Sequence, residues 1–431
     1  MRVTSHDSRG VANASETSEI ALCPPLSYRS VIRINVAQRG FHFRAYPLED
    51  QADLLRRTFG CSRFVYNKAL AERRDAWMKH KKTVGYLATS RMLTAWKKQS
   101  DLAFLNQVSC VPLQQALRHL QTAYTKFFEK RAAYPAFKRK GHGGSVEFTR
   151  RAFRWDAKAQ TLTLAKMAKP LPIRWSRPLP AGVEPSTVTV SLDAAGRWHV
   201  SLLCEDASIQ PLPEIESSIG IDVGVATLAT LSTAEKIPNG RQDERLMKRR
   251  KRLSRSLSRK KKGSKNWHKD RLKLARNHAR AADRRMDDTH KLSTRLVREN
   301  QVIVVEDLSL QNMARNRRLA RVLYDAGLGE LIRQLAYKSA WYGRYFLKID
   351  RFYPSSKRCS CCGHVLDRLP LGVRHWTCPA CAAEHDRDVN AARNILAAGL
   401  AVTACGPDVR QRILQTMLQL GLKQESASVT K

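Results

Sequence analysis

Four cysteines in two matched pairs carry the most specific chemistry in this 431-residue chain. Cys359 and Cys362 form the first pair and Cys378 and Cys381 the second, in the pattern C-x2-C-x15-C-x2-C. A two-residue gap lets one turn present both sulfurs to a tetrahedral ion, and Gly363 permits the left-handed backbone that such a turn commonly needs. Because thiolates at this spacing select zinc over harder cations, the sequence predicts a structural zinc ribbon.

Two other uses of paired cysteines explain the pattern less well. A disulfide network needs an oxidising compartment, and we see no secretory leader in the sequence. A redox C-x-x-C motif explains one pair but not two matched pairs. Cys361 lies between two predicted ligands, and we expect its side chain to point away from the metal.

Three acidic residues stand where buried segments end or a helix begins. Asp222 ends an apolar segment that starts at Ser218, and Glu306 follows a run of four β-forming residues. Asp388 opens a helical pattern just after the cysteines, with Asp386 beside it. Taken singly, each acid is better explained as a strand end leaving for solvent or as a helix N-cap.

Taken together, the acids indicate a metal site. Functional groups gather where parallel strands end, and carboxylates gathered there repel one another unless cations neutralise them. Mg²⁺ prefers oxygen ligands, and two such ions about 3.5–4 Å apart can activate water and stabilise the leaving oxygen in phosphodiester hydrolysis. We therefore predict a two-magnesium site formed by Asp222, Glu306 and Asp388, with Asp386 as the neighbouring alternative.

The charge of the chain indicates a polyanionic partner. Its 77 Lys and Arg residues against 38 acids give a formal net charge of +39, which exceeds what solubility requires. Residues 248–285 hold eighteen basic and two acidic residues, which predicts long basic helices with Trp267 as a stacking surface. A basic membrane-binding protein is the competing interpretation, but no apolar run of about 18 residues and no lipidation signal supports it. We expect a cytoplasmic or nucleoid-associated protein without a small-molecule substrate.

Several segments resemble hallmark motifs of the TnpB family. They are GIDVGVATLATLS, VIVVEDLSLQNMARN, RFYPSSKRCSCCG and CPACAAEHDRDVNAARNIL, while RAYPLEDQ and CSRFVYNKAL resemble its amino-terminal helical region. The resemblance runs from about Phe41 to Leu396. TnpB proteins are encoded by insertion sequences, were long called OrfB transposases, and are compact relatives of type V CRISPR effector nucleases.

The resemblance implies an α/β RuvC-like nuclease of the RNase H fold with an inserted zinc ribbon, a helical lobe and a small β-barrel. It implies catalytic, magnesium-binding roles for Asp222, Glu306 and Asp388. It implies that zinc is bound by Cys359, Cys362, Cys378 and Cys381. It also implies a monomer that binds one guide RNA from its own transposon end and cleaves double-stranded DNA beside a short motif, with guide pairing supplying sequence specificity.

Periodicity and the resemblance together predict the domain boundaries. Apolar residues recur at helical spacing after Asp50 and at alternate positions from Phe137 to Glu205, and the strand ending before Pro47 is expected to join the later strands. The predicted parts are a disordered extension (1–37), the first strand of the barrel or wedge domain (38–49), a helical recognition lobe (50–135), the rest of the barrel (136–210), the first nuclease part (216–357) with basic helices (244–300), the zinc ribbon (358–384), the last nuclease part (385–400) and a carboxy-terminal tail (401–431).

Three rival functions stay open. A DNA transposase shares the fold and the two-metal chemistry but needs a domain that recognises transposon ends, and we see none in the sequence. An RNA-guided binder that has lost its active site should lack at least one of the three acids, and this chain has all three. The third rival is a CRISPR effector, and a repeat array rather than a transposon end in the neighbouring DNA would distinguish it from a transposon nuclease.

Overall fold

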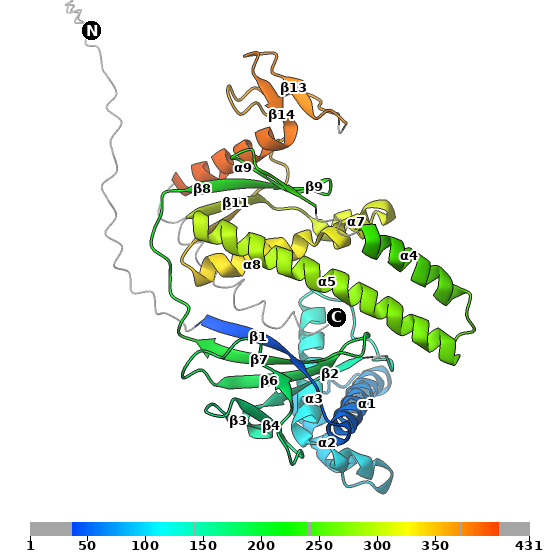
Figure 1. Ribbon diagram of the computed structural model, residues 1–431. Helices are drawn as coiled ribbons and strands as arrows, with labels where there is room; N and C mark the ends of the chain where they lie inside the picture. The colour runs from blue at the N-terminus through cyan, green and yellow to red at the C-terminus, as the bar shows by residue number, and fades with distance from the viewer. Residues whose placement is uncertain (1–36, 142, 240–243, 371, 405–431) are drawn as a thin grey trace, which may run out of the picture. The chain divides into compact units, whose positions relative to one another are not determined.

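The computed structural model describes residues 37–141, 143–239, 244–370 and 372–404, which belong to one compact unit (Figure 1). They form a mixed α/β protein with two five-stranded sheets, as the sequence predicts in outline. The predicted extension at 1–37, apart from Ala37, and the tail beyond Ala404 lie outside the described residues.

The first sheet is antiparallel, in the order β2-β6-β7-β1-β5. β1 (Ala37–Ala45) pairs along its whole length with β7 (Trp198–Asp206), so the first strand joins strands that come much later in the chain. The other strands are β2 (Gly144–Thr149), β5 (Ile173–Arg174) and β6 (Pro185–Leu192). A hairpin of β3 (Phe153–Asp156) and β4 (Thr161–Leu164) packs into the same apolar core.

A helical segment is inserted between β1 and β2. It comprises α1 (Glu49–His80), α2 (Tyr86–Trp96), a 3-10 helix (Ser100–Gln107) and α3 (Cys110–Phe128), which share a core of their own. α3 begins at Cys110, so Pro112 lies within its first turn. Proline lacks an N–H group that the first turn does not use, so the helix includes it without losing a hydrogen bond.

The second sheet has the order β10-β9-β8-β11-β12. β8, β11 and β12 run parallel to one another. On the other side of β8, β9 pairs antiparallel with β8, and β10 pairs antiparallel with β9. Its strands are β8 (Ser218–Val223), β9 (Thr227–Leu231), β10 (Lys236–Pro238), β11 (Val302–Glu306) and β12 (Tyr345–Ile349). The residues of β11 alternate between two cores, because Ile303 and Val305 face one side and Val304 faces the other.

Helices cover both faces of this sheet. α5 (Lys265–Glu299) and α8 (Leu328–Trp341) pack on the face of Ile303, and α9 (Arg387–Ala404) lies across β8 and β11 on the opposite face (Figure 1). α9 comes close to the sheet, since a Cβ on Gly220 would lie 2.7 Å from the backbone nitrogen of Leu396. The helix continues four residues past the predicted boundary at 400.

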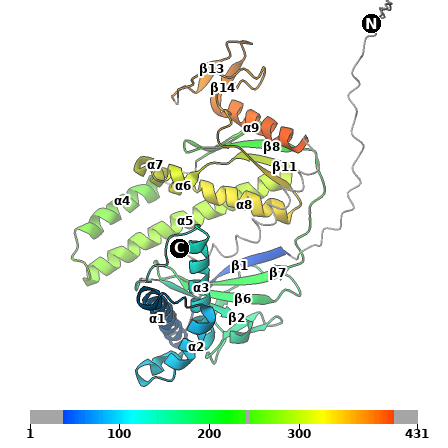
Figure 2. The same ribbon diagram turned by 180° about the vertical axis from the view of Figure 1, so that it is seen from behind.

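The remaining elements flank the second sheet. α4 (Glu244–Ser258) runs beside α5, and both are basic helices as predicted (Figure 2). The short helices α6 (Leu310–Met313) and α7 (Arg317–Ala326) follow β11. β13 (His375–Thr377) and β14 (Glu384–Asp386) form a small hairpin at the start of α9. No helix among the described ranges is long and apolar enough to cross a membrane.

Candidate active site

Two neighbouring parallel strands carry an acid at the same end. Ile221 of β8 lies opposite Val305 of β11, so Asp222 and Glu306 follow at the same level of the sheet. Side chains alternate between the faces of a strand, and Gly220, two residues before Asp222, faces α9. The same alternation places Glu306 on the face of Val304, which packs with α9. Both half-buried acids therefore lie on the side of the sheet that α9 covers.

At the start of α9, Asp386 and Asp388 have different roles. Oδ1 of Asp386 accepts hydrogen bonds from the backbone nitrogens of Asp388, at 3.1 Å, and Val389, at 3.0 Å, so Asp386 caps the helix. Its Oδ2 lies 2.6 Å from Nζ of Lys236. Burial opposes the charge of Asp386, but these hydrogen bonds hold its pKa below the ordinary value. Asp388 lies in the first turn, with its carboxylate outside the cap.

The other two predicted acids affect the pKa of Asp222. Burial raises the pKa of Asp222 to about 7, and the nearby carboxylates of Asp388 and Glu306 add to that rise. Burial also raises the pKa of Glu306. The pKa of Asp222 thus depends on Glu306, which lies 84 residues later in the sequence, and on Asp388 in the first turn of α9. The fold brings the three predicted residues into one neighbourhood.

A basic side chain from the hairpin reaches this neighbourhood. Nη1 of Arg374 lies 3.2 Å from Oδ1 of Asp388. Within the described residues, no choice of one oxygen from each of the three carboxylates brings all three oxygens within 4.8 Å of one another. Like charges repel one another, and Asp388 pairs with Arg374 instead. Arg374 was not predicted from the sequence, because nothing in its local pattern distinguishes it from the many other basic residues.

Asp307 has a different role from its neighbour Glu306. Its carboxylate lies 3.2 Å from Nζ of Lys348 and 3.1 Å from a guanidinium nitrogen of Arg351. Two exposed cations therefore neutralise Asp307 on the surface. Asp307 is therefore next to the candidate site in the sequence but is not part of that site.

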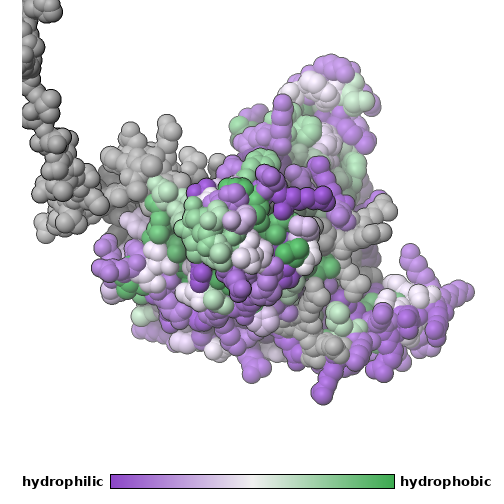
Figure 3. Space-filling model, turned by 90° about the horizontal axis from the view of Figure 1, so that it is seen from above, coloured by the Kyte–Doolittle hydropathy of each residue, from purple (hydrophilic) through white to green (hydrophobic). Residues whose placement is uncertain are grey.

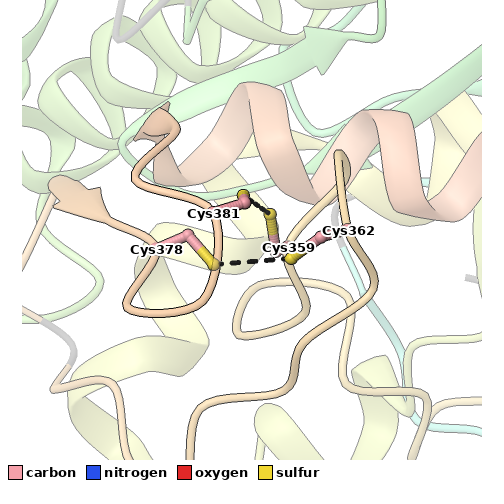
Figure 4. Close-up of side chains that lie close together, drawn as sticks. All are labelled: Cys359, Cys362, Cys378 and Cys381. Carbon is pink, nitrogen blue, oxygen red and sulfur yellow. Dashed lines mark hydrogen bonds between the residues drawn. The ribbon is translucent and has the colours of Figure 1, made fainter.

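The four predicted cysteines converge (Figure 4). The sulfurs of Cys359, Cys362, Cys378 and Cys381 all lie within 4.8 Å of one another, and we call this group the cysteine cluster. The Sγ atoms are 3.7 Å apart between Cys359 and Cys381 and 3.6 Å apart between Cys362 and Cys378. Gly363 adopts a φ of 80° after the first pair, as expected for such a turn. Four thiols at these distances could bind a zinc ion.

A histidine that the sequence analysis did not assign lies beside the cluster. Nε2 of His385 is 3.0 Å from Sγ of Cys359, and His385 and Cys361 form a second close group with that sulfur. Burial opposes a thiolate at Cys359, but backbone N–H groups of Cys362 and Cys361 and the ring of His385 lower its pKa to about 5. His385 lies four residues after Cys381 in the sequence, and this short spacing could have indicated that it lies beside the cysteine cluster.

Basic residues dominate the outer helices. α4 and α5 together extend from Glu244 to Glu299, and exposed Lys and Arg side chains follow them. Hydrophilic side chains also gather on the face seen from above, between smaller apolar patches (Figure 3). The predicted stacking residue Trp267 is half-buried and packs edge to face with His268 at 5.0 Å. These surfaces suit a polyanion.

Three family profiles match the chain. Residues 199–317 match "Probable transposase" of the OrfB_IS605 type, 329–395 match "Cas12f1-like, TNB domain", and 37–82 match an OrfB "Helix-turn-helix domain". The last range covers β1 and α1, where the structure has a strand and one 32-residue helix.

Several curated relatives match most of the chain. A "Putative RNA-guided DNA endonuclease" of Streptomyces pristinaespiralis is 56% identical over 91% of this chain and 97% of its own length. The "Putative RNA-guided DNA endonuclease InsQ" of Escherichia coli K12 is 35% identical over 86% of this chain and 95% of its own. A solved "Cas12f1-sgRNA-target DNA complex" is 16% identical, with a TM-score of 0.48, and covers 81% of this chain and 83% of that one.

Proposed function

The chain belongs to the TnpB family of RNA-guided DNA endonucleases, and from this premise we propose that it binds a guide RNA and hydrolyses matching double-stranded DNA. The guide is transcribed from the transposon end, and cleavage takes place next to a short target-adjacent motif. Base pairing with the guide supplies the sequence specificity, while the protein holds the heteroduplex by its shape and backbone.

One observation carries the proposal: three acids from distant parts of the chain lie on the same face of one sheet. Asp222 is the last but one residue of β8, Glu306 ends the adjacent parallel strand, and Asp388 lies in the first turn of the helix that crosses both. The raised pKa of Asp222 supports this arrangement, because burial and both other carboxylates contribute to it. A buried group of like charges is costly unless cations bind there.

The acids fit a site for hard divalent cations, since their donors are all carboxylate oxygens. Two Mg²⁺ ions bound there would activate water and stabilise the leaving oxygen of a phosphodiester. Asp222, Glu306 and Asp388 would hold these ions and fix them relative to the sheet. Asp386 keeps the first turn of α9 in place by capping it. The products then carry 5′-phosphate and 3′-hydroxyl ends.

The finer architecture follows from the same premise. The second sheet with α5, α8 and α9 is an RNase H-like, RuvC-type nuclease domain, and the cysteine cluster is a structural zinc ribbon inserted before α9. The first sheet and the β3–β4 hairpin form a small barrel around the core that they share. The basic faces of α4 and α5 bind the nucleic-acid backbone.

A matched pair of adjacent acids tests the proposal. The protein is purified with its copurified RNA, that RNA is sequenced, and a plasmid with the matching target is offered in the presence of Mg²⁺. Glu306→Gln should reduce cleavage at least about 10³-fold and leave the bound RNA unchanged, because it removes one metal ligand. Asp307→Asn should cleave like the parent, since Asp307 pairs with Lys348 and Arg351 on the surface.

The outcomes separate the proposal from its rivals. Parental cleavage by Glu306→Gln would exclude the assigned site. An absence of copurified RNA, together with joining of transposon ends by the protein alone, would instead indicate a transposase. RNA-directed binding without cleavage by the parent would indicate a binding protein.

A further inference from the structure

A hydrogen bond joins the cysteine cluster to the segment that begins α9. Nε2 of His385 lies 3.0 Å from Sγ of Cys359. Both side chains are buried, with exposed fractions of 5% and 1%. His385 immediately precedes the cap residue Asp386 and lies three residues before Asp388. One predicted zinc ligand is therefore tied to the segment that carries a predicted magnesium ligand.

Two asparagines of α9 also form hydrogen bonds to the turn that contains Cys359. Oδ1 of Asn390 accepts a hydrogen bond from the backbone nitrogen of Ser360 at 2.9 Å, and its Nδ2 donates to the carbonyl oxygen of Arg358 at 2.8 Å. Nδ2 of Asn394, one helical turn later, donates to the same carbonyl oxygen at 2.6 Å. Both amides are buried, so they need these partners. The hydrogen-bonded backbone groups flank Cys359 on both sides.

The position of α9 in turn sets the position of Asp388. The helix approaches β8 so closely at Gly220 that the contact fixes its distance from the sheet. Asp388 lies two residues before Asn390 in the same helix. A change in the turn around Cys359 would therefore move Asp388 relative to Asp222 and Glu306.

We propose that His385 and Asn390 are positioning residues that couple zinc binding at the cysteine cluster to the geometry of Asp388. The inference rests on the proposed function, because it takes Asp388 as a magnesium ligand. His385 donates an N–H group to the Cys359 thiolate, which stabilises the charged ligand and orients it. Asn390 holds the backbone on either side of that ligand. An ordered cysteine cluster thus keeps Asp388 at the distance that cation binding needs.

A purely structural role for His385 would lower stability and cleavage together. If His385 couples the two sites, its removal should lower the affinity for Mg²⁺. It should leave the cleavage rate at saturating Mg²⁺ unchanged. Two measurements report that affinity. One is the Mg²⁺ concentration that gives half-maximal plasmid cleavage, and the other is the rise in melting temperature that Mg²⁺ alone produces, which needs no catalysis.

Three variants of the full chain with its RNA make the comparison. His385→Ala should bind zinc about 10-fold more weakly, which is the usual effect of removing a ligand's hydrogen-bond partner, and should raise the half-saturating Mg²⁺ concentration measurably above that of the parent. His385→Gln keeps an N–H donor near the same position and should restore parental Mg²⁺ dependence. His364→Ala changes an exposed histidine of the same segment and should behave like the parent.

A parental Mg²⁺ dependence in His385→Ala, by both measurements, would overturn the proposal. If His385→Ala does not fold, the coupling can be tested in the parent protein by removing its zinc. Removing zinc with a chelator that spares Mg²⁺ should weaken the Mg²⁺-induced rise in melting temperature, and added zinc should restore it. An unchanged rise after zinc removal would overturn the coupling.

The design also separates this inference from the proposed function. If the parent does not cleave DNA, or Glu306→Gln cleaves it, the nuclease assignment fails on its own. If the parent cleaves and depends on Glu306 while zinc and His385 leave Mg²⁺ binding unchanged, only the coupling fails.

Discussion

Asp222 lies in surroundings that oppose its charge. Burial and the carboxylates of Asp388 and Glu306 together raise its pKa to about 7. Its ordinary value of 3.8 describes the unfolded chain, so between about pH 4 and pH 7 the folded chain binds the extra proton. Stability therefore falls as the pH rises through this window, and bound cations would reverse the loss.

We predict that Asp222→Asn stabilises the protein while abolishing cleavage. The amide resembles the protonated carboxyl and carries no charge to bury, so without Mg²⁺ the variant should gain roughly 2 kcal/mol at pH 8. The gain should shrink as the pH falls and should vanish below about pH 4, where Asp222 becomes protonated in both the folded and the unfolded state. Denaturant unfolding at several pH values measures the difference. A variant less stable than the parent at pH 8 without Mg²⁺ would show that Asp222 is not held among like charges.

At the level of elements, the site depends on how closely α9 lies against the second sheet. Gly220 of β8 faces the carbonyl oxygen of Ala392, and Gly399 of α9 faces Val304, where a Cβ would lie 2.5 Å from Cγ1. Because Gly220 has no side chain, the backbone of α9 can approach the backbone of β8. Because Gly399 has none, the side chain of Val304 can approach the backbone of α9. This contact brings the first turn of α9, with Asp388, towards the ends of β8 and β11.

We predict that Gly220→Ala moves α9 and disables the site. The added methyl would collide with backbone atoms of Ala392 and Leu396, which cannot rotate away, so the unfolding free energy should fall by about 1–3 kcal/mol. Cleavage should fall with it, because Asp388 is displaced.

Gly60→Ala in α1 is the matched control for this change. A Cβ there meets nothing within 4 Å, and alanine favours a helix, so stability should rise by up to about 1 kcal/mol with parental cleavage. Thermal melting and plasmid cleavage check both variants. Parental stability and cleavage in Gly220→Ala would show that the close approach of α9 is not needed.

For the molecule as a whole, the sequence predicted features that local pattern determines. Apolar runs ending in an acid predicted β8 and β11, and their parallel pairing places Asp222 beside Glu306. Cysteine spacing predicted the cysteine cluster, because a two-residue gap is a local constraint. The dense basic region predicted α4 and α5.

Contacts between separate elements could not be predicted in the same way. The hydrogen bond between His385 and Cys359 and the ion pair between Arg374 and Asp388 exist only because the chain before α9 folds back onto the start of that helix. No periodicity or spacing in the chain encodes that packing. The identity of the residue that caps α9 also needed the structure, because Asp386 and Asp388 could each cap a helix until the hydrogen bonds to Asp386 were seen.

Diffraction from crystals of the protein with its RNA, grown with Mn²⁺ in place of Mg²⁺, tests most directly where the cations bind. The anomalous signal of Mn²⁺ locates each ion independently of any assigned ligand. The account predicts Mn²⁺ in direct contact with carboxylate oxygens of Asp222, Glu306 and Asp388. Ions bound by Asp386 or Asp307 instead, or touching only one of the three acids, would contradict it.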